Sequence, residues 1–155
     1  MAEKPTSPET TLQIRRTFAA PRQKVFEAWT ESEKVTRWLC RVTKAHSTKL
    51  LELDVRVGGH YRLEVTTPEG NHMLLSGRYL EVKPPDKLVL TWEWEGDPDF
   101  GETVLTLDFL ARGNSTELVL THERFPNKES RDRHAVGWNG CFDQLEELLQ
   151  AEVAR

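Results

Sequence analysis

Apolar and polar residues alternate with a period of two along seven segments of the chain, which predicts seven β-strands. The first is "LQIRRTF", where Leu12 and Ile14 alternate with Gln13 and Arg15. Six more lie between residues 50 and 125: "LLELDV", "GHYRLEV", "MLLSGRYLEV", "LVLTWEWE", "ETVLTLDFL" and "TELVLTHERF". Short turns rich in Gly, Pro, Asp and Asn separate these six, so neighbouring strands are expected to be antiparallel.

The apolar period lengthens to that of a helix in three places. "RQKVFEAW" predicts a first short helix, and "TESEKVTRWL" predicts a second one that begins with a capping box from Thr30 to Glu33. The third helix is long, with Asn127 as its cap, and runs to about Gln150.

This order of elements predicts an α+β fold. One face of a sheet is buried only when another element covers it, so a curved antiparallel sheet of about six or seven strands is expected to wrap around the long C-terminal helix. The two short helices follow the first strand. A chain of 155 residues suits one domain, which we assign to residues 11–152, after a flexible N-terminal tail at residues 1–10.

Composition narrows the classes of partner. The net charge is −4, and acidic and basic residues are interspersed, without the basic stripe that nucleic-acid binding requires. No apolar run is long enough for a membrane span, and the first residues lack the apolar core of a signal peptide. Two distant cysteines, Cys40 and Cys141, suit a reducing compartment, so a cytoplasmic location is expected.

Five segments in this order resemble a known superfamily. They are "FAAPRQKVFEAWTESEKVTRWL", "VGGHYRLEV", "SGRYLEVKPPDKLVLTWEW", "STELVLTHERF" and "HAVGWNGCFDQLEELL". From about Ile14 to Leu149 the chain resembles the START-like (SRPBCC, helix-grip) superfamily, in particular its bacterial branch homologous to the activator of heat-shock protein 90 ATPase. The resemblance implies a cavity between the sheet and the long helix, in a family that includes ligand carriers, cyclases and co-chaperones.

The long helix presents one apolar stripe, centred on Trp138 at 100° per residue. Its C-terminal half, from Leu145 to Leu149, is ordinary core. Its N-terminal half combines His134, Trp138, Cys141 and Phe142, a mixture that suits a cavity wall with a few polar groups. The alternative is that Trp138 and Phe142 are simply large core residues.

The strands and the second helix supply further candidates. Alternation turns His122 inward and gives Trp92 and Trp94 one face, either to fill the core or to stack on a flat ligand. By resemblance, Trp38 lies near the cavity mouth, and two tyrosines offer hydroxyl groups inside. The expected ligand-binding residues are Trp38, Tyr61, Tyr79, Trp92, Trp94, His122, His134, Trp138, Cys141 and Phe142.

The sequence gives little indication of a catalytic, metal or cofactor site. No catalytic or phosphate-binding motif is present, and the five histidines lack the spacing of a zinc site, so neither a metal nor another cofactor is expected. Cys141 is interpreted as an inert buried thiol, about two helical turns from His134. The preferred interpretation of His122 is a core histidine, and the alternatives are a proton donor or a hydrogen-bond partner of the ligand.

Three functions therefore remain, and binding is preferred to catalysis. The first is binding of a small hydrophobic or aromatic molecule in the cavity. The second is a co-chaperone-like interaction module, with a protein partner or a second copy of the chain as a homodimer. The third is a cyclase, dehydratase or hydrolase that uses His122 as its acid or base.

Two glycines interrupt the long helix at a cost of about 0.5–1 kcal/mol each. Gly137 lies at the edge of the buried stripe, where it permits a close approach to the sheet or keeps the cavity mouth open. Gly140 faces away from the sheet, so we interpret it, with Asn139, as a bend or soft turn that lets the upper helix move.

Overall fold

The structure is a computed structural model that describes residues 8–153. Its strands are β1 (Leu12–Phe18), β2 (Ser47–Leu53), β3 (His60–Thr66), β4 (His72–Lys83), β5 (Lys87–Trp94), β6 (Thr103–Arg112) and β7 (Ser115–Glu123). Its helices are α1 (Arg22–Thr30), α2 (Ser32–Val35) and α3 (Lys128–Val153). The predicted order of elements is confirmed.

The seven strands form one antiparallel sheet in the order β1-β7-β6-β5-β4-β3-β2. β1 therefore pairs with β7, the most distant strand in the sequence, and not with β2. The crossing is possible because α1, α2 and the loop after them carry the chain from one edge of the sheet to the other.

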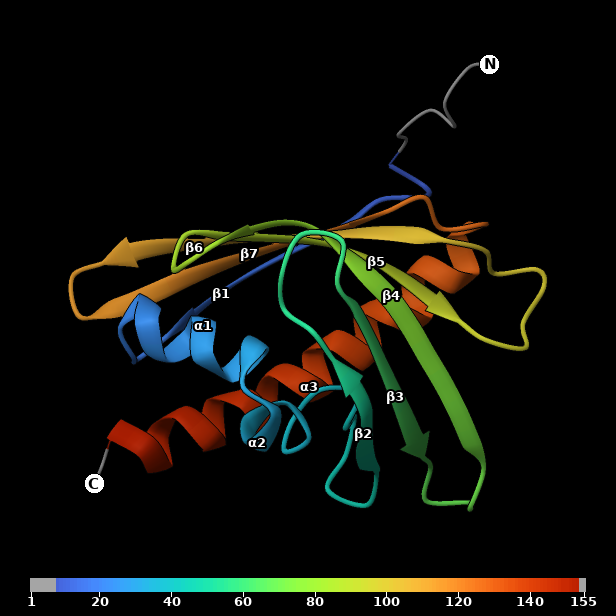
Figure 1. Ribbon diagram of the computed structural model, residues 1–155, viewed down its shortest axis with the longest axis horizontal. Helices are drawn as coiled ribbons and strands as arrows, with labels where there is room; N and C mark the ends of the chain where they lie inside the picture. The colour runs from blue at the N-terminus through green and yellow to red at the C-terminus, as the bar shows by residue number, and fades with distance from the viewer. Residues whose placement is uncertain (1–7, 154–155) are drawn as a thin grey trace.

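The long helix α3 lies across the curved sheet, with α1 and α2 beside the C-terminal half of α3 (Figure 1). Its buried side chains are those of the predicted apolar stripe: Trp138, Cys141, Phe142, Leu145, Leu148 and Leu149, together with Ser130. This is the predicted α+β helix-grip arrangement.

The core is tightly packed around the C-terminal half of α3. The ring of Phe142 meets Phe18 of β1 edge-on, with 5.7 Å between centroids. Trp38, fully buried, packs against Trp29 at 4.5 Å and against Phe142 at 6.4 Å. These contacts join the helices to the sheet and fill the space between them.

The second short helix differs from expectation at both of its ends, since α2 spans only Ser32–Val35 and not residues 30–39. Thr30 ends α1, and its hydroxyl donates to the carbonyl of Phe26 at 3.0 Å. The capping box expected from Thr30 to Glu33 is therefore wrong, and α2 has no side-chain cap. The cap of α3 is confirmed, since Asn127 Oδ1 accepts from the Ser130 N–H at 2.8 Å.

Gly140 has a different role from the bend that its helical position suggests. α3 is one uninterrupted helix through this residue. A Cβ on Gly140 would lie 2.3 Å from the carbonyl oxygen of Val42, which belongs to the loop between α2 and β2. The interpretation of Gly140 as a soft turn is corrected: the glycine lets that loop pack directly on the helix. A Cβ on Gly137 would make only ordinary contact, with Val42 Cγ2 at 3.7 Å.

The expected N-terminal tail lies mostly outside the described residues. Of residues 8–10, Pro8 accepts a hydrogen bond from Arg131 and Thr10 accepts one from the backbone of Phe125. Within residues 8–153, no helix is long and apolar enough to cross a membrane.

Candidate functional site

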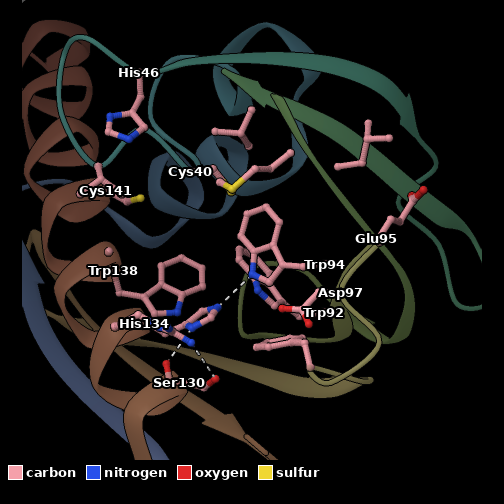
Figure 2. Close-up of a pocket in the computed structure, with 18 of the residues that line it drawn as sticks. Cys40, His46, Trp92, Trp94, Glu95, Asp97, Ser130, His134, Trp138 and Cys141 are labelled. Atoms are coloured by element: carbon pink, nitrogen blue, oxygen red, sulfur yellow. Dashed lines mark hydrogen bonds between the residues drawn. The ribbon is translucent and has the colours of Figure 1, made fainter. Parts of the chain in front are cut away.

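A cleft of about 520 Å³ opens between the N-terminal half of α3 and the sheet (Figure 2). Its floor is the start of β4 and the end of β5, and two loops complete its sides, one after α2 and one after β5. It is lined by Cys40, Val42, His46, Val65, His72, Met73, Leu74, Trp92, Trp94, Glu95, Gly96, Asp97, Phe100, Ser130, Arg133, His134, Gly137, Trp138 and Cys141. Most of these side chains are apolar or aromatic.

Three indole rings form the inner wall of the cleft. Trp92 on β5 packs against Trp138 on α3 with centroids 4.9 Å apart, and meets Trp94 edge-on at 5.9 Å. Alternation along β5 places Trp92 and Trp94 on one face, and the helical stripe brings Trp138 opposite them. The result is a broad aromatic surface of the kind that binds flat apolar molecules.

His134 fixes the outermost of these rings. Its Nε2 accepts a hydrogen bond from the Trp94 indole N–H at 3.0 Å, and its Nδ1 lies 2.9 Å from the Ser130 carbonyl, to which it donates (Figure 2). Both ring nitrogens are thus committed in the neutral form. Burial lowers the pKa of His134, which favours the same form.

His122 lies behind the cleft wall, with no exposed surface. Its Nδ1 accepts from the Trp138 indole N–H at 3.2 Å, and its Nε2 lies 2.7 Å from Thr103 Oγ1. The Thr103 hydroxyl donates to the Trp92 carbonyl at 2.6 Å, so it accepts from His122 Nε2. Burial, and secondarily the nearby His134, lower the pKa of His122 well below its ordinary value. This histidine is a neutral support for Trp138, with no nitrogen left for an incoming molecule.

Charged groups occur only at the rim. Glu95 accepts two hydrogen bonds from Arg62, at 2.8 and 2.9 Å. These hydrogen bonds are the main cause of the lowered pKa of Glu95. Arg133 contacts Ser130 Oγ at 3.3 Å and is exposed to solvent. The side chains that line the cleft inside this rim do not include a general acid placed beside a general base.

The two cysteines are free, buried thiols on the cleft wall. Burial raises the pKa of Cys141 to about 12 and that of Cys40 well above its ordinary value. Both remain neutral at ordinary pH, and a neutral thiol is a weak nucleophile.

The structure divides the ten expected site residues into two groups. Five line the cleft: Trp92, Trp94, His134, Trp138 and Cys141. The other five belong to the packed interior: Trp38, Tyr61, Tyr79, His122 and Phe142. The polar groups of the second set serve the fold: the Trp38 N–H donates to the Ala28 carbonyl at 2.9 Å, and the Tyr61 hydroxyl donates to the Thr91 carbonyl at 2.5 Å.

Other lining residues were not among the candidates. Val65 and Met73 share the inward face of β3 and β4, so strand alternation was a usable signal for them. Val42 and His46, in the loop after α2, and Phe100, in the loop after β5, have no such signal, because irregular loops lack a period. Within the part of the chain that the structure describes, no group of three His, Cys, Asp or Glu could hold a metal ion.

Comparison with known protein families shows which family this chain belongs to. The family model described as "Activator of Hsp90 ATPase homolog 1-like protein" matches residues 19–150. The chain belongs to this family. The match covers α1 through nearly all of α3, and therefore the entire cleft.

Relatives of this Hsp90-activator-like family span bacteria and human. The chain is 24% identical over 135 residues to "Activator of 90 kDa heat shock protein ATPase homolog 1" from Homo sapiens, covering 87% of this chain and 35% of that protein. The chain thus spans about a third of the length of this relative.

Two solved bacterial structures share the fold over nearly their whole length. Protein CV1439 from Chromobacterium violaceum has 26% identity and a TM-score of 0.84, with 90% of this chain and 96% of that chain covered. Protein NE0264 from Nitrosomonas europaea has 26% identity and a TM-score of 0.80, with 96% and 99% covered.

Proposed function

We propose that this protein binds a small apolar or aromatic molecule in the cleft between the sheet and the N-terminal half of α3. The observation that carries the proposal is the wall of Trp92, Trp94 and Trp138. A volume of about 520 Å³ is within the range of small-molecule sites, roughly 300–1,000 Å³. Burial of aromatic area against these rings supplies the binding free energy.

A matched pair of variants on β4 tests the proposal. Met73 and Leu80 are 40% and 41% exposed, but only Met73 lines the cleft. The probe is N-phenyl-1-naphthylamine, an uncharged aromatic molecule whose fluorescence rises in apolar surroundings. Met73→Glu is expected to weaken its binding by about tenfold or more, because a carboxylate beside an apolar ligand loses hydration. Leu80→Glu is expected to leave binding unchanged, and equal effects of the two variants would refute the site.

Native mass spectrometry of the protein purified from its own host would detect the natural ligand. A co-purifying small molecule that is retained by Leu80→Glu and lost from Met73→Glu is the expected result. Its composition would then identify the ligand. We place this binding in the cytoplasm, a location favoured by the two free, buried thiols.

A second candidate is interaction with a chaperone, supported by the name of the human relative. This function would use an exposed surface and not the cleft. Retention of an Hsp90-type ATPase on immobilised protein, unaffected by Met73→Glu, would favour it. Absence of retention at micromolar protein would exclude a partner of useful affinity.

No catalytic role is assigned to His122. Both of its nitrogens are used within the fold, and Trp138 separates it from the cleft. The neighbouring cleft histidine, His134, lies 5.4 Å away between ring centroids, and both of its nitrogens already have partners in Trp94 and Ser130.

A further inference from the structure

A hydrogen bond between His134 and Trp94 joins the two sides of the cleft. His134 belongs to α3 and Trp94 to the end of β5, and both side chains line the cleft (Figure 2). The Trp94 indole N–H donates to His134 Nε2 at 3.0 Å. Trp94 is half-buried, whereas Trp92 and Trp138 are each only 3% exposed. Trp94 is therefore the most exposed of the three indole rings, and the helix holds it in place.

The partners of His134 require its neutral form. Its Nδ1 lies 2.9 Å from the Ser130 carbonyl, and a carbonyl can only accept, so Nδ1 carries a hydrogen. The Trp94 indole nitrogen can only donate, so Nε2 must present its lone pair. Protonation of Nε2 would turn a second N–H toward the indole N–H. The hydrogen bond to Trp94 is thus incompatible with a protonated imidazole.

This hydrogen bond is the only one that the Trp94 side chain makes, because an indole has a single N–H. Its aromatic contacts within residues 8–153 are with Trp92, edge-on at 5.9 Å between centroids, and with His134 itself at 6.4 Å. Loss of the hydrogen bond therefore leaves Trp94 attached to the wall through packing against Trp92 alone.

The surroundings of His134 oppose its protonation. Burial is the main reason that its pKa is lowered, the hydrogen bond to Ser130 acts in the opposite direction, and the positive charge of Arg133 adds to the lowering. The ordinary pKa of a histidine is about 6.5, so protonation of the folded protein occurs below this pH.

The rings that pack on His134 bring no negative charge to balance an imidazolium. Phe100 stacks on it at 5.2 Å, Phe125 lies at 5.0 Å, and His122 on β7 lies at 5.4 Å, which makes His122 the titratable group among these rings. The remaining titratable side chains of the cleft, apart from Arg133, are Cys40, His46, His72, Glu95, Asp97 and Cys141.

We propose that His134 and Trp94 form a pH-dependent latch on the cleft, in which neutral His134 holds Trp94 in the aromatic wall and protonated His134 releases both Trp94 and the bound ligand. The inference rests on the proposed function and adds the regulation of that site. Proton and ligand then compete, so a bound ligand lowers the proton affinity of His134 by the same factor by which the proton lowers the ligand affinity.

Binding of N-phenyl-1-naphthylamine between about pH 8 and pH 5 tests the latch, because this probe stays uncharged in that range. Its dissociation constant in wild-type protein should be constant near pH 8 and should rise by up to about tenfold per pH unit below the pKa of His134. Circular dichroism at each pH confines the comparison to folded protein.

His134→Gln separates the latch from a general effect of acid. The glutamine amide oxygen can accept from Trp94 but does not titrate, so the dissociation constant should vary by less than about twofold over the same range. His46→Gln and His72→Gln are the matched controls, since both histidines line the cleft but bond to Thr43 and Thr66 and not to an indole. Each control should keep the pH dependence of wild-type protein.

Nuclear magnetic resonance follows the latch without a ligand. The indole N–H signal of Trp94, assigned by its absence from Trp94→Phe, should move upfield on acidification with the same midpoint as the ring protons of His134. The indole signal of Trp38 is the internal control and should not follow that midpoint, because its acceptor is the Ala28 carbonyl.

The outcomes separate the two proposals. A dissociation constant that is independent of pH in wild-type protein, or a pH dependence retained by His134→Gln, would overturn the latch and leave the cleft as an apolar binding site. A probe that does not bind at pH 7.5 would overturn the proposed function. In that case a shared midpoint of Trp94 and His134 would still support the release of Trp94, and different midpoints would overturn it.

Discussion

At the scale of the residue, the two inward histidines act as hydrogen-bond acceptors for tryptophans. His122 accepts from Trp138, and His134 accepts from Trp94. Each neutral imidazole offers one acceptor and one donor nitrogen, and in both residues the donor nitrogen has its own partner. The histidines thus orient the aromatic wall of the cleft and do not present a reactive group to it.

This arrangement predicts that folding stability decreases in mild acid. Burial lowers the pKa of His122 in the folded state, so below about pH 6.5 the unfolded chain binds a proton that the folded chain does not. The free energy of unfolding should then fall, by up to about 1.4 kcal/mol per pH unit for this histidine, from about pH 6.5 downward to its folded-state pKa. Urea denaturation between about pH 7.5 and pH 5 measures the slope.

His122→Gln is the control for this slope. Its amide can accept from Trp138 and donate to Thr103 but does not titrate in this range, so stability at neutral pH should be partly retained while the slope becomes smaller. His122→Phe removes the acceptor and should cost about 1–3 kcal/mol at neutral pH. An unchanged slope in His122→Gln would show that other groups control the acid sensitivity.

At the scale of the element, α3 combines a packed C-terminal half with an N-terminal half that borders the cleft. Leu145, Leu148 and Leu149 anchor the first against the sheet. In the second, Gly140 allows the loop after α2 to pack on the helix backbone at Val42. That loop then forms one side of the cleft, so the glycine shapes the site through its neighbour.

The two helical glycines should respond in opposite ways to alanine. Gly140→Ala would set a Cβ 2.3 Å from the Val42 carbonyl oxygen and should destabilise the fold by about 1–3 kcal/mol. Gly137→Ala meets only Val42 Cγ2 at 3.7 Å and should stabilise the helix by about 0.5–1 kcal/mol. Chemical denaturation of both variants measures the difference, and a stabilising Gly140→Ala would contradict the close packing of the loop.

At the scale of the whole molecule, one end of the helix–sheet interface is closed and the other is open. α1 and α2 cover the closed end, where Lys34 pairs with Glu152 at 3.3 Å. At the open end, the cleft lies between α3 and the start of β4, and the loops after α2 and after β5 complete its sides. Ligand binding should therefore stabilise the half of the molecule that contains the cleft more than the other half.

Hydrogen exchange measures this asymmetry. With an aromatic probe at about 100 times its dissociation constant, unfolding should cost about 2.7 kcal/mol more than without it. New local protection should concentrate in the loops at residues 40–46 and 95–100 and in α3 from residue 130 to 141. Equal protection along the C-terminal half of α3 would instead indicate binding elsewhere or a general tightening of the fold.

The sequence predicted the fold better than the site, as particular residues illustrate. Alternation identified the shared face of Trp92 and Trp94, and the helical period identified Trp138, and all three line the cleft. The helical period also selected Phe142, and the family resemblance selected Trp38, but both are buried in the core. Periodicity reports which side chains turn inward but does not distinguish a filled interior from an open one.

What the sequence determined by itself is therefore local: the strands, the long helix, its apolar stripe and its Asn127 cap. These depend on residues a few positions apart, whose spacing defines the period. Tertiary structure alone decided where the interior remains open, because this depends on side chains distant in sequence. It brought Val42 against Gly140 and His122 behind Trp138.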